Sequence, residues 1–147
     1  IITTQGSIME SLLIKDYMNH YPVTFTPEMV VEEASLRFLK TKQIGGPVIN
    51  NKKAVIGFLS ESDILAKMLA SIYHNEHTTD VESLMNKEVL SVKPYDSIFE
   101  LAQRMLGNKP KVYPVVDDDG HLLGTICRND VLKAIDQHMK VSFLAGS

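Results

Sequence analysis

The sequence Gly-Phe-Leu-Ser-Glu-Ser-Asp at residues 57–63 returns as Gly-Thr-Ile-Cys-Arg-Asn-Asp at residues 124–130. The match extends outward from these two stretches, because residues 14–65 align with residues 81–132 at a constant shift of 67 without a gap. Twelve of the 52 aligned pairs are identical, whereas average amino-acid composition would give roughly three. The chain therefore contains an internal duplication, and each copy is expected to fold in the same way.

The first helix of each copy is predicted from its starting residues and its apolar stripe. In the first copy Thr26 is a predicted N-cap and Pro27 a first-turn proline, whereas Ser97 and Glu100 of the second copy predict a capping box. The stripe has the spacing i, i+3, i+7, i+8 and is expected to be buried. It consists of Val31, Ala34, Phe38 and Leu39 in the first copy and Ile98, Leu101, Met105 and Leu106 in the second.

Three short strands and a second helix complete each copy. The last two strands of each copy are separated by a polar turn and predict a hairpin. The strands are expected at residues 23–25, 47–49 and 55–59, and again at residues 90–92, 114–116 and 122–126. The second helix begins near Asp63 or Asp130 and is expected to bury Ile64, Leu65, Met68, Leu69 and Ile72, or Val131, Leu132 and Ile135.

Each copy is thus a β-α-β-β-α unit of about 55 residues, which buries little surface alone. The predicted fold class is α+β (α/β), with two units related by a pseudo-twofold axis, sheet packed against sheet, and a cleft between them. The predicted organisation is an N-terminal segment (1–13), a first repeat (14–73), a linker (74–80), a second repeat (81–138) and a C-terminal tail (139–147). Residues 1–8 precede Met9 and are left out of the fold prediction.

Composition excludes several classes of protein. The net charge of −3 argues against nucleic-acid binding and against a polybasic membrane patch. No apolar run approaches the length of a membrane span, and the N-terminus lacks the pattern of a signal peptide. The single cysteine, Cys127, does not imply an oxidising compartment. We therefore expect a cytoplasmic protein.

The duplicated stretches resemble the CBS domain. The resemblance rests on Gly46-Pro47-Val48-Ile49 followed by residues 57–63, and on Tyr113-Pro114-Val115-Val116 followed by residues 124–130. It implies a tandem regulatory module that forms a homodimer, binds AMP, ADP, ATP or a related adenosine compound between the repeats, and regulates a partner protein. S-adenosylmethionine is a less favoured candidate. No cofactor and no catalytic activity are expected.

The residues around Asp63 predict a nucleotide site. A helix N-terminus favours a phosphate, and an aspartate there can accept hydrogen bonds from a ribose diol. Ser60 and Asp63 match the hydroxyl and the aspartate of the family motif. The same Ser-x-x-Asp pair also predicts a capping box, and that alternative stays open. In the second copy Asp130 persists while Cys127 replaces the hydroxyl.

Further contacts are expected from both copies. Arg128 and Lys111 are predicted to bind phosphate, so the site built on the second copy is expected to prefer the more phosphorylated ligand. Tyr113 either stacks on the base, belongs to the core or blocks the cleft. The complete predicted nucleotide-binding set is Thr24, Gly46, Pro47, Ser60, Asp63, Ser91, Lys111, Tyr113, Pro114, Arg128 and Asp130.

Two readings of function remain from the sequence. The first is an adenosine-nucleotide sensor that signals to a partner protein, and the alternative is a ligand-free interaction or dimerisation module with degenerate clefts, which Cys127 and Tyr113 favour. No metal site is predicted: His74 and His77 end a helix, and residues 117–120 lack the ligand spacing of an EF-hand and predict a hairpin turn.

Overall fold

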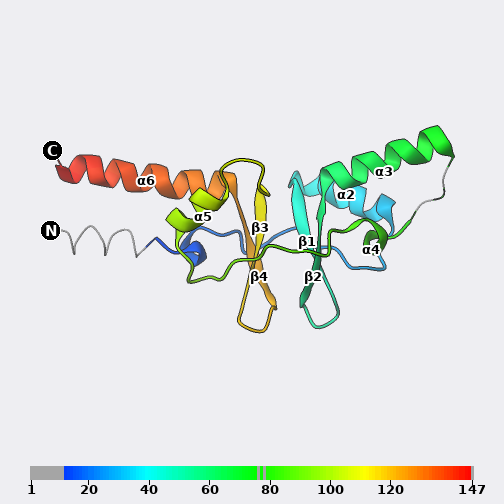
Figure 1. The fold of residues 1–147 in the computed structure, drawn as a ribbon, viewed down its shortest axis with the longest axis horizontal. Coiled ribbons are helices and arrows are strands. Elements are labelled where there is room, and N and C mark those ends of the chain that lie inside the picture. The colour runs from blue at the N-terminus through cyan, green and yellow to red at the C-terminus, as the bar shows by residue number, and fades with distance from the viewer. Residues whose placement is uncertain (1–11, 76, 78, 147) are drawn as a thin grey trace.

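The computed structural model describes residues 12–75, 77 and 79–146, with side chains described as far as Val141. Two small hairpin sheets lie side by side at the centre, and the helices extend outward on both sides (Figure 1). In chain order the elements are η1 (Ile14–Asp16), α2 (Val31–Thr41), β1 (Gly45–Ile49), β2 (Val55–Ser60), α3 (Glu61–His74), α4 (Val81–Leu84), α5 (Ile98–Arg104), β3 (Val112–Val116), β4 (Leu122–Cys127) and α6 (Arg128–Gly146).

The two hairpins have the same register. β1 pairs antiparallel with β2 and β3 with β4, and each hairpin shifts register once near its turn. The first strand of each repeat is shorter than predicted, because it consists of a single parallel bridge: Phe25 with Val48, and Val92 with Val115. A proline follows two residues after each bridge and lacks the N–H that a longer ladder would need. The α+β class is confirmed, with the first strand reduced to one residue.

Each half has its own core, and each core contains a segment from the other sequence repeat. Ile14 is fully buried among residues of α5, β3, β4 and α6. Val81, at the start of α4, is fully buried among residues of α2, β1, β2 and α3. The first segment of each repeat therefore crosses to the opposite half. We call residues 12–22 and 79–89 the crossed segments.

Backbone hydrogen bonds fasten the crossed segments to the sheets. Asn19 N–H donates to the Thr125 carbonyl at 2.7 Å, and Thr125 N–H donates back at 3.0 Å. Asn86 and Phe58 exchange the equivalent pair at 2.8 and 2.9 Å. Each two-stranded sheet thus gains an edge contact from the other repeat, which compensates for the small size of each unit.

The hairpin ends also join the two halves. Val55 N–H donates to the Gly120 carbonyl at 3.1 Å, and Leu122 N–H donates to the Lys53 carbonyl at 2.9 Å. Together with the contact between β1 and β3, these bonds hold the sheets against each other, as predicted. None of the helices in the described part of the chain is both long and apolar enough to cross a bilayer.

The predicted start of the first helix is wrong in the first copy and confirmed in part in the second. Residues 26–29 form a turn, and α2 begins at Val31 without a side-chain cap. The Pro27 and Met29 carbonyls accept N–H groups of α4 at 3.0 and 2.8 Å, so this turn serves the crossed segment. In the second copy Ser97 caps α5 and accepts the N–H groups of Phe99 and Glu100, as expected, but no hydrogen bond returns from the Ser97 N–H to the Glu100 side chain among the described residues, so the predicted capping box is only half formed.

The predicted apolar stripes are too wide. Leu39 and Leu106 are 73% and 75% exposed, and the second helices bury only one side of their predicted set. In the first copy the reason is that α2 and α3 pack one face against a sheet of two strands, and nothing in the described chain covers the opposite face. In the second copy α5 ends at Arg104, so Leu106 lies beyond the helix. The predicted core residues that are exposed are Leu39, Leu65, Met68, Leu69, Ile72, Leu106 and Leu132.

Candidate functional site

Two pockets lie between the repeats, one on each side of the contact between β1 and β3. Gly45 and Val112 line both of them. These residues are 67 positions apart and therefore equivalent in the duplication, so the pseudo-twofold axis passes close to both. Because of this symmetry, each pocket is lined by residues of one copy of the motif and by residues around the start of β1 or β3 in the other copy.

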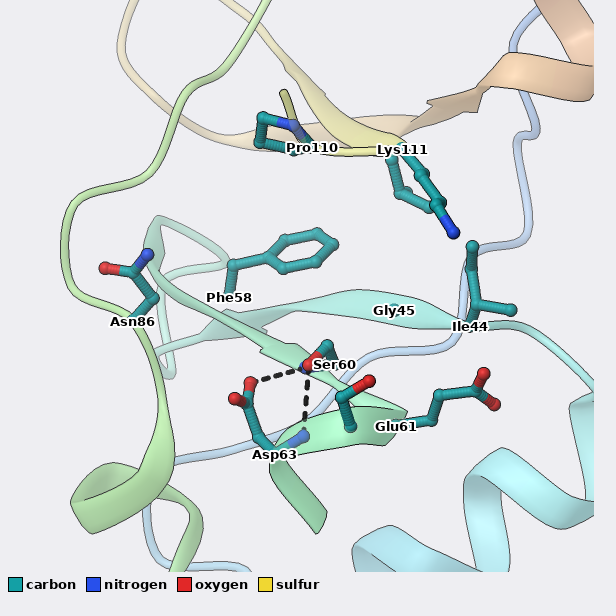
Figure 2. Close-up of a pocket in the computed structure, with 11 residues that line it drawn as sticks. Ile44, Gly45, Phe58, Ser60, Glu61, Asp63, Asn86, Pro110 and Lys111 are labelled. Atoms are coloured by element: carbon teal, nitrogen blue, oxygen red, sulfur yellow. Dashed lines mark hydrogen bonds between the residues drawn. The ribbon is translucent and has the colours of Figure 1, made fainter. Parts of the chain in front are cut away.

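The Asp63 pocket is a cavity of about 370 Å³ at the N-terminus of α3 (Figure 2). Its volume falls in the range of small-molecule sites, roughly 300–1,000 Å³. The first repeat contributes Ile44, Gly45, Phe58 and residues 60–63, and the second contributes Asn86 and residues 110–112. A smaller cavity of about 240 Å³ adjoins it through Phe58, Asn86, Pro110 and Val112, and extends to residues 88–90 and Pro114.

The Asp130 pocket is its counterpart, with a volume of about 490 Å³. Residues 42–45 of the first repeat face Thr125, Cys127 and Asp130 of the second. Asn19, from the crossed segment, completes it as Asn86 completes the Asp63 pocket. Both pockets therefore have an aspartate at the start of a helix and an asparagine from a crossed segment.

Asp63 and Ser60 form the capping box that the sequence left open as an alternative. The Ser60 N–H donates to Asp63 Oδ2 at 3.0 Å, and the Asp63 N–H donates to Ser60 Oγ at 3.1 Å (Figure 2). The cap occupies one oxygen of each side chain. Among the described residues, Asp63 Oδ1 accepts no hydrogen bond and the Ser60 hydroxyl donates none. Capping and ligand contact are therefore compatible, since both residues line the cavity.

Asp130 has a similar bond but a different neighbour. The Cys127 N–H donates to Asp130 Oδ2 at 2.9 Å. The Cys127 thiol stands where the first copy has a hydroxyl, and its burial raises its pKa above the ordinary value. The thiol is therefore neutral at neutral pH and a weak hydrogen-bonding group. The other polar side chains that line the Asp130 pocket belong to Asn19, Lys42, Gln43 and Thr125.

The two predicted phosphate-binding cations are not together. Lys111, although it belongs to the second repeat, lines the Asp63 pocket and not the pocket that contains Asp130. Arg128 lines neither pocket, because its guanidinium donates to the carbonyls of Met105 at 3.1 Å and Gly107 at 3.4 Å after α5. The expectation that both cations serve the site of the second copy is thus corrected. Lys42 is the lysine in the Asp130 pocket.

Several other predicted site residues serve the fold. Tyr113 is 1% exposed, with the Arg104 guanidinium 5.5 Å from its ring centre, so it belongs to the core, one of the three alternatives. Pro47 is fully buried, and a Cβ at Gly46 would collide with the Val23 carbonyl. The Thr24 carbonyl accepts from Arg37 at 2.7 Å. Pro114 is buried at the edge of the cavity that adjoins the Asp63 pocket. Ser91 is exposed and lines neither pocket.

The sequence prediction missed the two asparagines and the pair Phe58 and Thr125. Asn19 and Asn86 are an identical pair in the duplication, which marks them. Their place in the pockets depends on the crossing of the segments, however, and local pattern does not predict it.

Asp117, Asp119 and His121 bring three potential metal ligands within 4.8 Å of one another. Asp117 Oδ1 accepts the backbone N–H groups of Asp119 and His121, each at 2.9 Å. The bond from the His121 N–H lowers the pKa of Asp117. These contacts form the hairpin turn that the sequence predicts.

The family model for the CBS domain matches residues 14–70 and again residues 81–137. The two matches cover most of the chain, and the protein belongs to the CBS domain family, of which it carries two copies.

Relatives carry the pair alone or as part of a longer chain. Uncharacterized protein MJ1426 of Methanocaldococcus jannaschii is 29% identical over 159 aligned residues, which cover 86% of this chain and 92% of that protein. Inosine-5'-monophosphate dehydrogenase of the same organism is 29% identical over 125 residues, but this chain spans only 23% of its length. The domain pair is therefore accessory in some enzymes.

A solved structure has the same architecture. CBSX2 of Arabidopsis thaliana, in complex with AMP, superposes with a TM-score of 0.76 and 27% identity over 88% of this chain and 99% of that chain. The pairing of two CBS units is thus common to both proteins.

Proposed function

We propose that this chain is a regulatory module that binds adenosine nucleotides or related adenosine compounds in the Asp63 and Asp130 pockets and signals their presence to a partner protein. The proposal includes a cytoplasmic location, where such ligands occur and where a lone thiol stays reduced. The module acts by binding and performs no chemistry itself.

The observation that carries the proposal is the duplicated aspartate. Each pocket places one carboxylate at a helix start, held by a single backbone hydrogen bond from the strand end. Among the described residues the second oxygen of Asp63 accepts no hydrogen bond, whereas the Asp130 carboxylate also interacts with the Cys127 thiol. Because an ionised carboxylate accepts hydrogen bonds at both oxygens, each aspartate can contact ribose hydroxyls while it caps the helix. The AMP bound by CBSX2 supports the ligand class.

Titration calorimetry tests the proposal, with AMP, ADP, ATP and S-adenosylmethionine added to the full chain. Saturable binding of at least one compound is expected, with a rise in melting temperature as ligand is added. Asp63→Ala and Asp130→Ala remove charge-assisted hydrogen bonds and should each weaken binding at their pocket by at least about tenfold.

Asp96→Ala is the matched control. Asp96 Oδ2 accepts the Lys93 N–H at 2.8 Å, so this variant loses a similar backbone bond away from both pockets. Its affinity should equal that of the unmodified chain. Unchanged affinity in both pocket variants would refute the site, and binding of none of the four compounds would favour the ligand-free interaction module.

We also propose that two copies associate through the exposed faces of the outer helices. α3 exposes Leu65, Leu69 and Ile72, and α6 exposes Leu132 and Met139, all at 45–75%. Monomeric proteins rarely expose contiguous apolar surface of this kind. Because the duplication places equivalent leucines (65 and 132) on both halves, a second copy of the chain can meet the same surface at either end.

Sedimentation velocity tests this association. The unmodified chain should sediment as a dimer, and Leu69→Glu should shift it to monomer while the melting transition persists. Leu123→Glu, on β4 near the hairpin end and 40% exposed, should leave the dimer intact. A monomeric unmodified chain would refute the proposal.

A further inference from the structure

The two pockets differ in charge, and the difference can be traced position by position through the duplication. This inference rests on the proposed function, in which Asp63 and Asp130 bind ribose in their respective pockets. Beyond those aspartates, the Asp63 pocket contains Glu61 and Lys111. The equivalent positions around the Asp130 pocket are Arg128 and Ile44.

Neither Arg128 nor Ile44 brings a charge into the Asp130 pocket. Arg128 is directed to the carbonyls of Met105 and Gly107 and does not line the Asp130 pocket. Ile44 is aliphatic. The Asp130 pocket therefore offers one cation, Lys42, beside its aspartate. The Asp63 pocket offers one cation and one additional carboxylate.

Glu61 and Lys111 approach the Asp63 pocket from opposite walls. Lys111 comes from the second repeat and Glu61 from the first turn of α3, and both lie on the side of the view away from the Asp63 carboxylate (Figure 2). Both side chains belong to exposed residues, and no ion pair joins them or engages either one in the described part of the chain. A ligand can therefore meet both charges at once.

A ligand with both signs of charge fits this arrangement better than a phosphate. A phosphate near Lys111 would also experience the negative charges of Glu61 and Asp63. An α-amino acid group is a zwitterion, and its ammonium can pair with Glu61 while its carboxylate pairs with Lys111. The Ser62 hydroxyl, in the same lining, adds a donor for the carboxylate.

We infer that the Asp63 pocket takes an adenosine derivative that carries an α-amino acid group, and that the Asp130 pocket takes the phosphate-bearing compound. The module would then respond to two different adenosine ligands rather than binding one ligand twice.

Calorimetric titration of the full chain with three probes tests the inference. S-adenosylhomocysteine carries the amino acid group, 5'-methylthioadenosine lacks it, and AMP carries a phosphate instead. S-adenosylhomocysteine should bind at least about tenfold more tightly than 5'-methylthioadenosine, because two charge-assisted contacts are added. AMP should leave that site available, since it fills the other pocket.

Two variants identify the charges responsible. Glu61→Gln should weaken S-adenosylhomocysteine by about three- to tenfold and leave the affinities for 5'-methylthioadenosine and AMP unchanged. Lys111→Met should weaken S-adenosylhomocysteine alone. Glu82→Gln, an exposed glutamate on α4 that lines neither pocket, is the matched control and should change none of the affinities.

The outcomes separate this inference from the proposed function. Equal affinity for S-adenosylhomocysteine and 5'-methylthioadenosine, or a ratio that Glu61→Gln does not reduce, overturns the inference while leaving an adenosine-binding module. Binding of none of the three probes overturns both.

Discussion

Gly57 and Gly124, an identical pair of the duplication, lie where the crossed segments pass the sheets. A Cβ on Gly124 would collide with the carbonyl oxygen of Asn19, and a Cβ on Gly57 with the sulfur of Met85. These glycines open the two motifs that resemble the family. Their absent side chains are required by packing between the repeats, so part of the family motif serves the fold rather than the ligand.

Gly124→Ala should destabilise the chain more than Gly57→Ala. The Asn19 carbonyl is backbone, and it accepts the Thr125 N–H at 3.0 Å, so it cannot move without breaking a bond. Met85 is flexible and can give way. We expect a loss of about 1–3 kcal/mol for Gly124→Ala, measured by urea unfolding. Leu123→Ala, at the exposed neighbouring position, is the control. Equal stability of both glycine variants would contradict the close approach.

Alkylation of Cys127 is expected to report ligand binding in the Asp130 pocket. Burial raises the pKa of its thiol, so at pH 8 a smaller fraction is thiolate than in a free cysteine, and alkylation by iodoacetamide should be slower. As pH rises toward the raised pKa, the rate should increase. Because Cys127 lines the pocket, saturating AMP should slow the reaction further. The measurement is mass spectrometry of alkylation against time, and an unchanged rate with AMP bound would contradict occupancy of this pocket.

At the scale of elements, local pattern predicts what local bonds determine. The hairpins and the Ser97 cap follow from turn residues and capping chemistry within a few positions, and the structure agrees. The start of α2 could not be predicted in this way. The carbonyls of Pro27 and Met29 accept N–H groups of α4, which lies about 50 residues later in the sequence. Lys111 joins Asp63 for the same kind of reason: the pseudo-twofold axis brings them together, and no local pattern encodes that axis.

Ser97→Ala tests the cap that the sequence predicted. Ser97 Oγ accepts the N–H groups of Phe99 at 3.1 Å and Glu100 at 3.4 Å. α5 spans only residues 98–104, so loss of its cap should cost about 1 kcal/mol, measured by thermal unfolding. Ser62→Ala, in the first turn of α3 and exposed, should change the melting temperature little. Identical melting of Ser97→Ala and the unmodified chain would show that the cap contributes nothing.

At the scale of the whole molecule, the crossed segments make two small cores depend on each other. Ile14→Ala should leave a cavity in the core of α5, β3, β4 and α6, although Ile14 precedes the first repeat's strands. We expect a loss of about 2–5 kcal/mol in a single unfolding transition followed by circular dichroism. Tyr21→Ala, 88% exposed, is the control. Two separate transitions would mean that the halves unfold independently.

The crossing has a consequence for a chain whose backbone is cut once. Hydrolysis of one peptide bond between α3 and α4, near Asn75, would give an N-terminal fragment that holds Ile14 and a C-terminal fragment that holds Val81. Each fragment would then contain the crossed segment that completes the hydrophobic core of the other fragment. Neither is complete by itself, and the two are expected to remain one particle after the covalent connection is lost.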